Sequence, residues 1–347
     1  MIEIINQFDI QGEIKSYRAF GSGHIHDTYK LITTEKEYIF QKINHNVFKD
    51  VAGMMKNIQS ITDYLPSSYD RLGISSQETL TLVRTYHKKN YVDHKTGYFR
   101  MFDFKSHLKS VDVPESEDQI FESAKSYGFF LKALRDFNPL NLSITIADFH
   151  NLDFRIRNYE KAKAKVKNLK RNPAEKQMAL VKSLSQQLLP VWSLDALSLV
   201  QKRVTHNDTK FNNVLFNEMN RGCCVIDLDT VMPGIVHYDF GDGIRSTCCT
   251  AAEDEMDLQL VTLDRNRFFA YKEGYLEGAK DELSISEIQF LPLSGAYMAF
   301  IMGLRMLTDF MEGNRYYKIN YPNHNLDRCK NQFKLCQNIL DQLKDLK

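Results

Sequence analysis

The stretch from Arg203 to Asp242 constrains the fold of this chain more than any other part of it. Two short apolar runs, Val214–Phe216 and Cys223–Leu228, flank a turn at Asn217–Gly222, which is the pattern of a β-hairpin. Polar residues gather at the outer ends of both runs. We therefore expect a hairpin that carries several polar side chains into one small volume.

These polar residues have the chemistry of a metal and proton-transfer site. His206, Asp208 and Asn213 precede the first run, and Asp227 and Asp229 lie at the end of the second. Asp and Asn in turns also cap backbone groups, but two such sets at the ends of paired strands favour a functional site. Carboxylate and amide oxygens can hold a divalent cation and leave one carboxylate free as a base.

The spacing of these residues resembles a known catalytic core. His206, Asp208 and Asn213 match H-x-D-x-x-x-x-N, and Ile226-Asp227 follows, as in the aminoglycoside phosphotransferase and choline kinase branch of the eukaryotic-like kinases. The resemblance implies an α+β, two-lobed protein-kinase-like fold with a small β-rich N-lobe and a larger, mainly helical C-lobe. It implies ATP and Mg²⁺ as cofactors, Asn213 and Asp227 as metal ligands, and Asp208 as the catalytic residue that meets the acceptor hydroxyl.

The fuller strings HNDTKFNN, VIDLDTVMPG and DFGD are similar to those of the N-acetylhexosamine 1-kinases, which phosphorylate the anomeric hydroxyl of GlcNAc or GalNAc. The string GLRMLTD resembles the sugar-contacting helix of that family, which implies that Arg305 binds sugar hydroxyls. Tyr316 and Tyr317 would then lie over the sugar, and Asp229 would contact it or support the site. Asp239, like His206, is interpreted as bracing the loop.

A glycine turn stands between two strand-like runs near the N-terminus. Gly21 and Gly23 are expected to let backbone N–H groups approach the nucleotide phosphates, although most such turns are simply hairpins. The string from Gly21 to Tyr29 is similar to the corresponding loop of the N-acetylhexosamine 1-kinases, which implies a substrate contact for His24.

The third expected strand, EYIFQKIN, contains Lys42 where kinases place the lysine that pairs with the phosphates. A slip of one residue would put Gln41 on that face instead. The next helix, expected over Val51–Leu65, should supply a glutamate partner. No glutamate occurs between Tyr38 and Gln77, so the usual lysine–glutamate pair is not expected in its standard form.

Two further strands are expected at Thr79–His87 and Gly97–Phe104, with a turn at Asn90–Lys95. The second ends at Phe102 and Phe104, where kinases bind adenine through backbone groups.

The lobe boundary is placed between residues 108 and 109, because the patterns beyond it are helical. The uncharged run Ile288–Leu304 contains Pro292 and falls short of the roughly 20 apolar residues of a membrane span, so a buried helix is predicted. The apolar stripe on the last helix, Leu326, Cys329, Phe333, Cys336, Leu340 and Leu343, is interpreted as core, with a dimer seam as the alternative.

Composition narrows the function classes. A length of 347 residues suits two lobes, and 45 Lys plus Arg balance 44 Asp plus Glu, which gives no electrostatic reason for a nucleic-acid or membrane partner. The N-terminus has no apolar signal segment, and six cysteines without metal-site spacing favour a reduced, cytoplasmic protein. The expected partners are ATP and a small sugar, with the protein a monomer or weak dimer.

Three functions remain open at this point. The first is an N-acetylhexosamine 1-kinase, and the second is a kinase of another small alcohol, such as an aminoglycoside, choline or another sugar. The third is a non-catalytic pseudokinase that binds nucleotide. The intact set of Asp208, Asn213 and Asp227 argues against the third function, and the missing glutamate argues for it.

Overall fold

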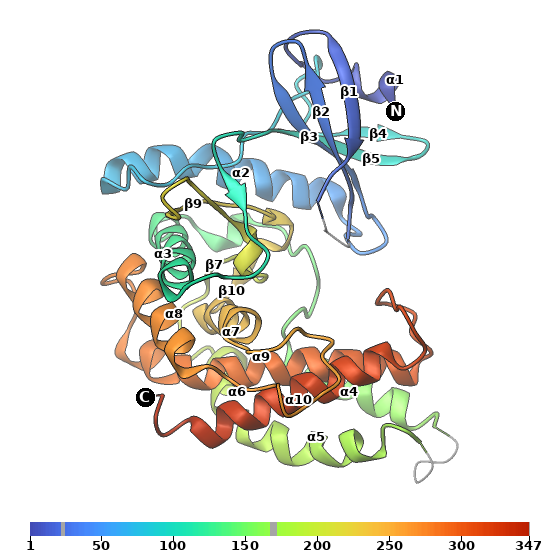
Figure 1. The fold of residues 1–347 in the computed structure, drawn as a ribbon, viewed down its shortest axis with the longest axis vertical. Coiled ribbons are helices and arrows are strands. Elements are labelled where there is room, and N and C mark those ends of the chain that lie inside the picture. The colour runs from blue at the N-terminus through green and yellow to red at the C-terminus, as the bar shows by residue number, and fades with distance from the viewer. Residues whose placement is uncertain (22–24, 167–171, 347) are drawn as a thin grey trace.

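The computed structural model describes residues 1–21, 25–166 and 172–346, and it has two lobes (Figure 1). A twisted sheet forms the small lobe at the top of the view, and helices form most of the larger lobe below it. The expected two-lobed α+β architecture is confirmed.

The N-lobe sheet is antiparallel, with strand order β1-β2-β3-β5-β4. Its strands are β1 (Ile14–Ala19), β2 (Asp27–Thr33), β3 (Glu37–Ile43), β4 (Val92–His94) and β5 (Gly97–Asp103). The short helix α1 (Ile2–Ile5) packs with Phe40 and Phe99 in a small core on one face of this sheet. Because side chains alternate along a strand, Ile39 and Ile43 project to the opposite face, where they join the main core of the molecule.

The strand expected at Thr79–His87 is wrong. This segment runs beside β5 and makes single bridges, Leu82 to Phe102 and Thr85 to Phe8, rather than a continuous ladder. The expected turn at Asn90–Lys95 instead contains β4, which forms a tight hairpin with β5. Gly97 makes that hairpin possible with a φ of +128°, which side chains rarely adopt.

Helix α2 (Val51–Leu72) extends beyond its expected end at Leu65, continues through Pro66, and ends at Gly73 in the left-handed conformation. Asp50 caps its start by accepting a hydrogen bond from Gly53 N. Its apolar face belongs to the main core. In Figure 1, α2 lies between the sheet and the C-lobe helices.

The C-lobe is built around one long helix, α9 (Ile285–Met311), which is long and apolar enough to cross a membrane. Of its most apolar 18-residue stretch, 83% is buried inside the molecule, which agrees with the predicted buried helix. The surrounding helices are α3 (Glu117–Ala133), α4 (Leu152–Lys163), α5 (Glu175–Gln187), α6 (Leu189–Ala196), α7 (Val236–Thr247), α8 (Arg265–Gly278) and α10 (His324–Gln342). The predicted stripe on α10 is core, since Leu326, Cys329, Phe333 and Cys336 are buried.

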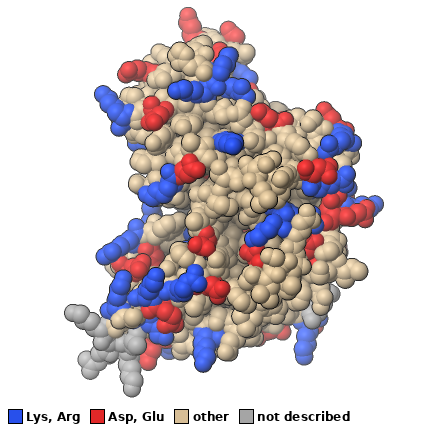
Figure 2. All heavy atoms as spheres, turned by 180° about the vertical axis from the view of Figure 1, so that it is seen from behind, with Lys and Arg blue, Asp and Glu red and all other residues tan. Residues whose placement is uncertain are grey.

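Short strands hold the polar loops of the C-lobe. β6 (Lys109–Ser110), β8 (Val214–Phe216) and β9 (Gly222–Val225) form one sheet, and β7 (Arg203–Thr205) pairs with β10 (Met232–Gly234). Because β6 already pairs with β8, the chain has joined the C-lobe by Lys109. On the face drawn in Figure 2, basic and acidic side chains are interspersed over most of the surface.

Candidate active site

The predicted hairpin is confirmed as β8 and β9. Hydrogen bonds to Asp239 and Ile226 hold the loop that precedes it. His206 N and Asn207 N donate to the Asp239 carboxylate at 2.8 and 2.7 Å, and His206 Nε2 donates to Ile226 O at 2.9 Å. Asn207 has a φ of +64°, which turns the chain sharply just before Asp208. The bracing interpretation of His206 and Asp239 is therefore confirmed.

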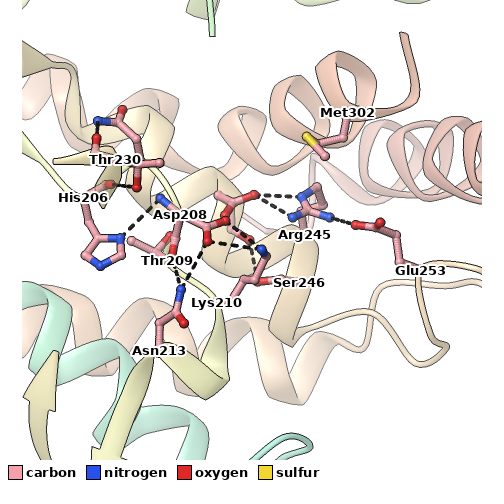
Figure 3. Close-up of polar contacts among 12 residues, drawn as sticks. His206, Asp208, Thr209, Lys210, Asn213, Thr230, Arg245, Ser246, Glu253 and Met302 are labelled. Carbon is pink, nitrogen blue, oxygen red and sulfur yellow. Dashed lines mark hydrogen bonds and ion pairs between the residues drawn. The ribbon is translucent and has the colours of Figure 1, made fainter. Parts of the chain in front are cut away.

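Asp208 lies on this loop beside Lys210 (Figure 3). Lys210 Nζ is 2.9 Å from Asp208 Oδ1 and 3.1 Å from Oδ2. Burial opposes ionisation of Asp208, but the nearby Lys210 ammonium outweighs it and holds the pKa of that carboxyl below its usual value. Asp208 is thus an ionised carboxylate, the form that a general base requires. Lys210 was missed at the sequence level, although its position two residues after Asp208 is a usable signal.

Asn213 and Asp227 stand next to each other at the end of the hairpin, because Ile226 N donates to Asn213 O at 2.9 Å. The Asn213 amide donates from Nδ2 to Asp208 O at 2.9 Å, which turns Oδ1 away from Asp208 (Figure 3). One amide oxygen and one carboxylate fit Mg²⁺, which usually takes one or two protein ligands and completes its shell with phosphate and water oxygens. These two residues therefore remain the proposed metal ligands.

Asp227 is electrostatically poised for a cation. Its backbone is left-handed, with φ 59° and ψ 55°, and its side chain opens to the cleft. Desolvation by the surrounding protein, together with the negative charges of Asp229 and Asp208, raises the pKa of Asp227 to about 6. A bound divalent cation would offset this repulsion directly.

The glycine turn is only partly described. Gly21 has a φ of +80° and no neighbouring atom where a Cβ would stand, so its backbone conformation, and not crowding, favours glycine there. The predictions for Gly23 and His24 concern residues outside the described ranges.

Lys42 does not face the cleft, which corrects the expectation that it binds phosphate. It lines a hollow of about 320 Å³ on the outer face of the sheet, together with Met1, Glu3 and Phe99. Gln41 takes the cleft-facing position on β3 and accepts a hydrogen bond from Arg100 Nε at 2.9 Å. The one-residue slip considered from the sequence is thus the arrangement observed.

Of the two roles expected for Asp229, the geometry favours support of the site, because N-lobe residues bind its carboxylate and it is not open to a sugar. Arg100 Nη1 donates to Oδ1, Arg100 Nη2 donates to Oδ2 at 2.8 Å, and His26 Nε2 is 2.5 Å from Oδ2. Asp229 and Arg100 are each 2% exposed. Burial alone would raise the pKa of Asp229, but Arg100 and His26 hold it far below its usual value.

The adenine contact expected at Phe102 and Phe104 stays a prediction. Phe104 N donates to Glu37 O at 3.0 Å, so that amide already has a partner. Phe102 lies in the ladder opposite Ile39, and its side chain is buried.

Arg305, Tyr316 and Tyr317 are brought together at the end of α9. The Arg305 guanidinium carbon is 5.9 and 5.6 Å from the two tyrosine ring centres and 4.9 Å from that of Phe149. Arg305 is not paired with Asp309, four residues later. Asp309 instead accepts hydrogen bonds from the backbone N–H groups of residues 315, 316 and 317.

His150 links this arginine–aromatic cluster to the catalytic loop. Its Nε2 donates to Asn207 O at 3.2 Å, next to Asp208, and its neighbour Phe149 lies under Arg305. Burial and the charge of Arg305 lower the pKa of His150 to about 3, so the ring is neutral. Its Nδ1 is buried and has no hydrogen-bond partner among the described residues.

The buried carboxylates near the catalytic loop form ion pairs with arginines. Arg245 Nε donates to Asp242 Oδ1 at 2.8 Å, and Arg245 Nη1 donates to Glu253 Oε2 at 2.7 Å (Figure 3). Arg328 Nε donates to Glu253 Oε1 at 3.0 Å. Burial opposes ionisation of Glu253, yet the two arginines lower its pKa to about 2. Sequence reasoning missed this network because its members are spread over 86 residues.

A small β-rich lobe, a helical lobe and an Asp/Asn/Asp set at a hairpin between them define a protein-kinase-like phosphotransferase architecture. Residues 16–275 match the model of the phosphotransferase enzyme family (APH), and this chain belongs to that family.

Solved structures share the fold at low identity. An aminoglycoside phosphotransferase from Alicyclobacillus acidocaldarius is 12% identical with a TM-score of 0.67, and the match covers 100% of this chain and 96% of that one. A microcompartment-associated aminopropanol kinase is 16% identical with a TM-score of 0.66, covering 99% and 96%. A spectinomycin phosphotransferase in complex with ADP and spectinomycin is 13% identical with a TM-score of 0.56, covering 96% and 94%.

Proposed function

We propose that this protein transfers the γ-phosphoryl group of ATP to the anomeric hydroxyl of an N-acetylhexosamine such as GlcNAc or GalNAc. Family membership supports phosphoryl transfer, and a solved relative of the same fold holds ADP. A kinase of a different small alcohol remains the competing function.

The positive charge around Arg305, where the acceptor is proposed to bind, is the observation that favours a neutral sugar as substrate. Arg305 and Arg155 lie close enough that burial and the charge of Arg305 lower the pKa of Arg155 to about 10. Neither has a carboxylate partner among the described residues, and Arg155 donates only to Phe149 O. A cationic aminoglycoside or choline would be repelled here, whereas sugar hydroxyls and an acetyl carbonyl can accept from guanidinium groups.

The aromatic rings around Arg305 support the same choice. Phe149, Tyr316 and Tyr317 offer apolar faces on which the C–H side of a sugar ring can pack, while polar groups at the edge fix its orientation.

In this proposal Asp208 orients the acceptor hydroxyl and takes its proton as the new oxygen–phosphorus bond forms and the bond to ADP breaks. Asn213 and Asp227 would hold Mg²⁺, whose chemistry is to neutralise charge on the phosphates. Lys210 keeps Asp208 ionised before the reaction. An anomeric hydroxyl is more acidic than other sugar hydroxyls, so positioning contributes as much as proton removal.

The proposal is tested by the product. Purified protein with ATP and Mg²⁺ is offered GlcNAc, GalNAc, glucose, choline, ethanolamine and an aminoglycoside, with ADP release measured for each. We expect turnover with an N-acetylhexosamine and coupling between ³¹P and the anomeric proton in the product. Phosphate at C6, or turnover confined to the amino alcohols, would reject the sugar 1-kinase function and leave the family assignment intact.

Arg305→Ala gives a matched check of the acceptor site. Because its contacts exist before the transition state, we expect the KM for the sugar to rise more than kcat falls, with the KM for ATP unchanged.

A further inference from the structure

The cleft contains a buried carboxylate that is gripped by two residues from the opposite lobe. Asp229 follows the β8–β9 hairpin in the C-lobe, whereas His26 and Arg100 belong to the N-lobe sheet and its glycine-turn connection. The His26 and Asp229 side chains are only 6% and 2% exposed. The contact is therefore an interior connection between lobes, and not a surface ion pair of little consequence.

His26 is held in one orientation. Its Nδ1 accepts a hydrogen bond from Asn44 N at 3.0 Å, so the ring proton must be on Nε2, which donates to Asp229 Oδ2. The ring stacks on Phe48, with 5.5 Å between centres. Through His26, the end of the glycine turn is attached to Asp229.

Arg100 is equally constrained. Its Nε donates to Gln41 Oε1, and Gln41 Nε2 in turn donates to Thr28 Oγ1 at 3.0 Å. The guanidinium lies over Phe102, 5.2 Å from the ring centre, and offers both terminal nitrogens to Asp229 in a bidentate pair. Three strands of the sheet, β2, β3 and β5, thus fix the cation that faces Asp229.

The part of the chain that the structure describes shows no standard lysine–glutamate pair between β3 and α2. Lys42 faces away from the cleft, and α2 contains no glutamate. Asp229 lies two residues after Asp227 within the tight turn at Leu228–Thr230. Fixing Asp229 therefore holds the backbone turn that carries Asp227, in the way that outer partners support metal ligands.

We propose that Arg100, Asp229 and His26 form an interlobe clamp that replaces the lysine–glutamate pair and positions Asp227 for a magnesium–nucleotide complex. The three are positioning residues. The clamp rests on the nucleotide-binding half of the proposed function and is independent of the acceptor sugar.

The test measures ADP binding by calorimetry, with Mg²⁺ and again in EDTA, for Arg100→Met, Asp229→Asn and the double variant. With Mg²⁺ present, we expect each single change to weaken ADP binding about 10- to 100-fold. The double variant should lose no more than the worse single variant, because both changes break one unit. Removing both charges together also leaves no unpaired buried ion, so the double variant is expected to fold even if a single variant does not.

The EDTA arm separates positioning from general damage. A clamp that orients Asp227 predicts a loss concentrated in the Mg²⁺ arm, whereas equal losses in both arms would overturn the proposal. Arg84→Met is the control, because Arg84 is an exposed N-lobe arginine whose partner Asp63 is also exposed. We expect it to bind like the wild type.

The failures of the two proposals are distinguishable. If the wild-type protein binds no magnesium–nucleotide complex, the kinase function itself fails. If the wild type binds and the double variant binds equally well, only the clamp is overturned.

Discussion

Lys210 sets the charge state of Asp208, and this pairing has a measurable consequence. The two side chains are 2.9 Å apart, and Lys210 is the largest influence that lowers the pKa of Asp208. Asp208 must be ionised to accept a proton, so its lowered pKa keeps the protein active toward lower pH. Without Lys210, burial would dominate and the pKa of Asp208 would rise.

We therefore expect Lys210→Met to move the acid limb of the kcat/KM–pH profile to higher pH. The variant would lose activity at a pH at which Asp208 of the wild type is still ionised. The reference variant is Asp208→Asn, for which kcat should fall roughly 10²–10⁴-fold with ADP affinity preserved. An acid limb in Lys210→Met at the wild-type position would show that another group controls it.

Residues whose partners are near in sequence were predictable, and those with distant partners were not. The clustering of Asp208, Asn213 and Asp227 follows from a hairpin whose strands are only a few residues apart. Arg100 finds Asp229 across 129 residues, and no local pattern marks it. Lys42 was predicted on the wrong face of β3. Side chains alternate between the two faces of a strand, so an error of one residue in register places a side chain on the opposite face.

The end of α9 shows how one carboxylate can shape a binding surface. Asp309 is 4% exposed and accepts from three consecutive backbone N–H groups and from Asn325 Nδ2 at 2.9 Å. This turn presents Tyr316 and Tyr317 to Arg305. From sequence alone, Asp309 four residues after Arg305 suggests a helical ion pair, and the structure uses it as a loop anchor instead.

Asp309→Ala should remove that anchor. It leaves several backbone donors without a partner, so we expect the free energy of unfolding to fall by about 2 kcal/mol or more. The KM for the acceptor should also rise, while the KM for ATP stays near its wild-type value. Urea unfolding and steady-state kinetics measure both, and Glu312→Ala, an exposed change one turn later, is the control. An equal rise in both KM values would contradict a local role.

Apolar patterns predicted the elements of the C-lobe well and those of the N-lobe less well. The buried α9 and the stripe on α10 follow from helical periodicity, which is a long and redundant signal. The segment Thr79–His87 has strand-like composition but makes only single bridges, because its neighbours are set by tertiary contacts.

The two lobes share one core, so the boundary in sequence is not a boundary in packing. Residues of α2, including Met54, Ile58, Ile61 and Leu65, are buried in the same cluster as the C-lobe helices, although α2 precedes the last strands of the N-lobe. The small core beneath α1 is separate.

Asn57 makes the polar contacts between α2 and the C-lobe. Replacing it tests whether the molecule unfolds as one unit. It is fully buried on α2, and its Nδ2 donates to Ser143 O at 2.8 Å and Val231 O at 2.9 Å, while its Oδ1 accepts from Ser143 N at 2.8 Å. Asn57→Ala removes the partner of three backbone groups, of which Val231 O is buried, so we expect the free energy of unfolding to fall by roughly 3 kcal/mol.

Circular dichroism reports the whole chain, and fluorescence of Trp192, the single tryptophan, reports the C-lobe helix α6. A shared core predicts that both urea midpoints fall together in Asn57→Ala, and that the exposed neighbouring change Lys56→Ala moves neither by much. Two separate midpoints, with only the circular dichroism signal affected, would mean that α2 unfolds independently of the C-lobe.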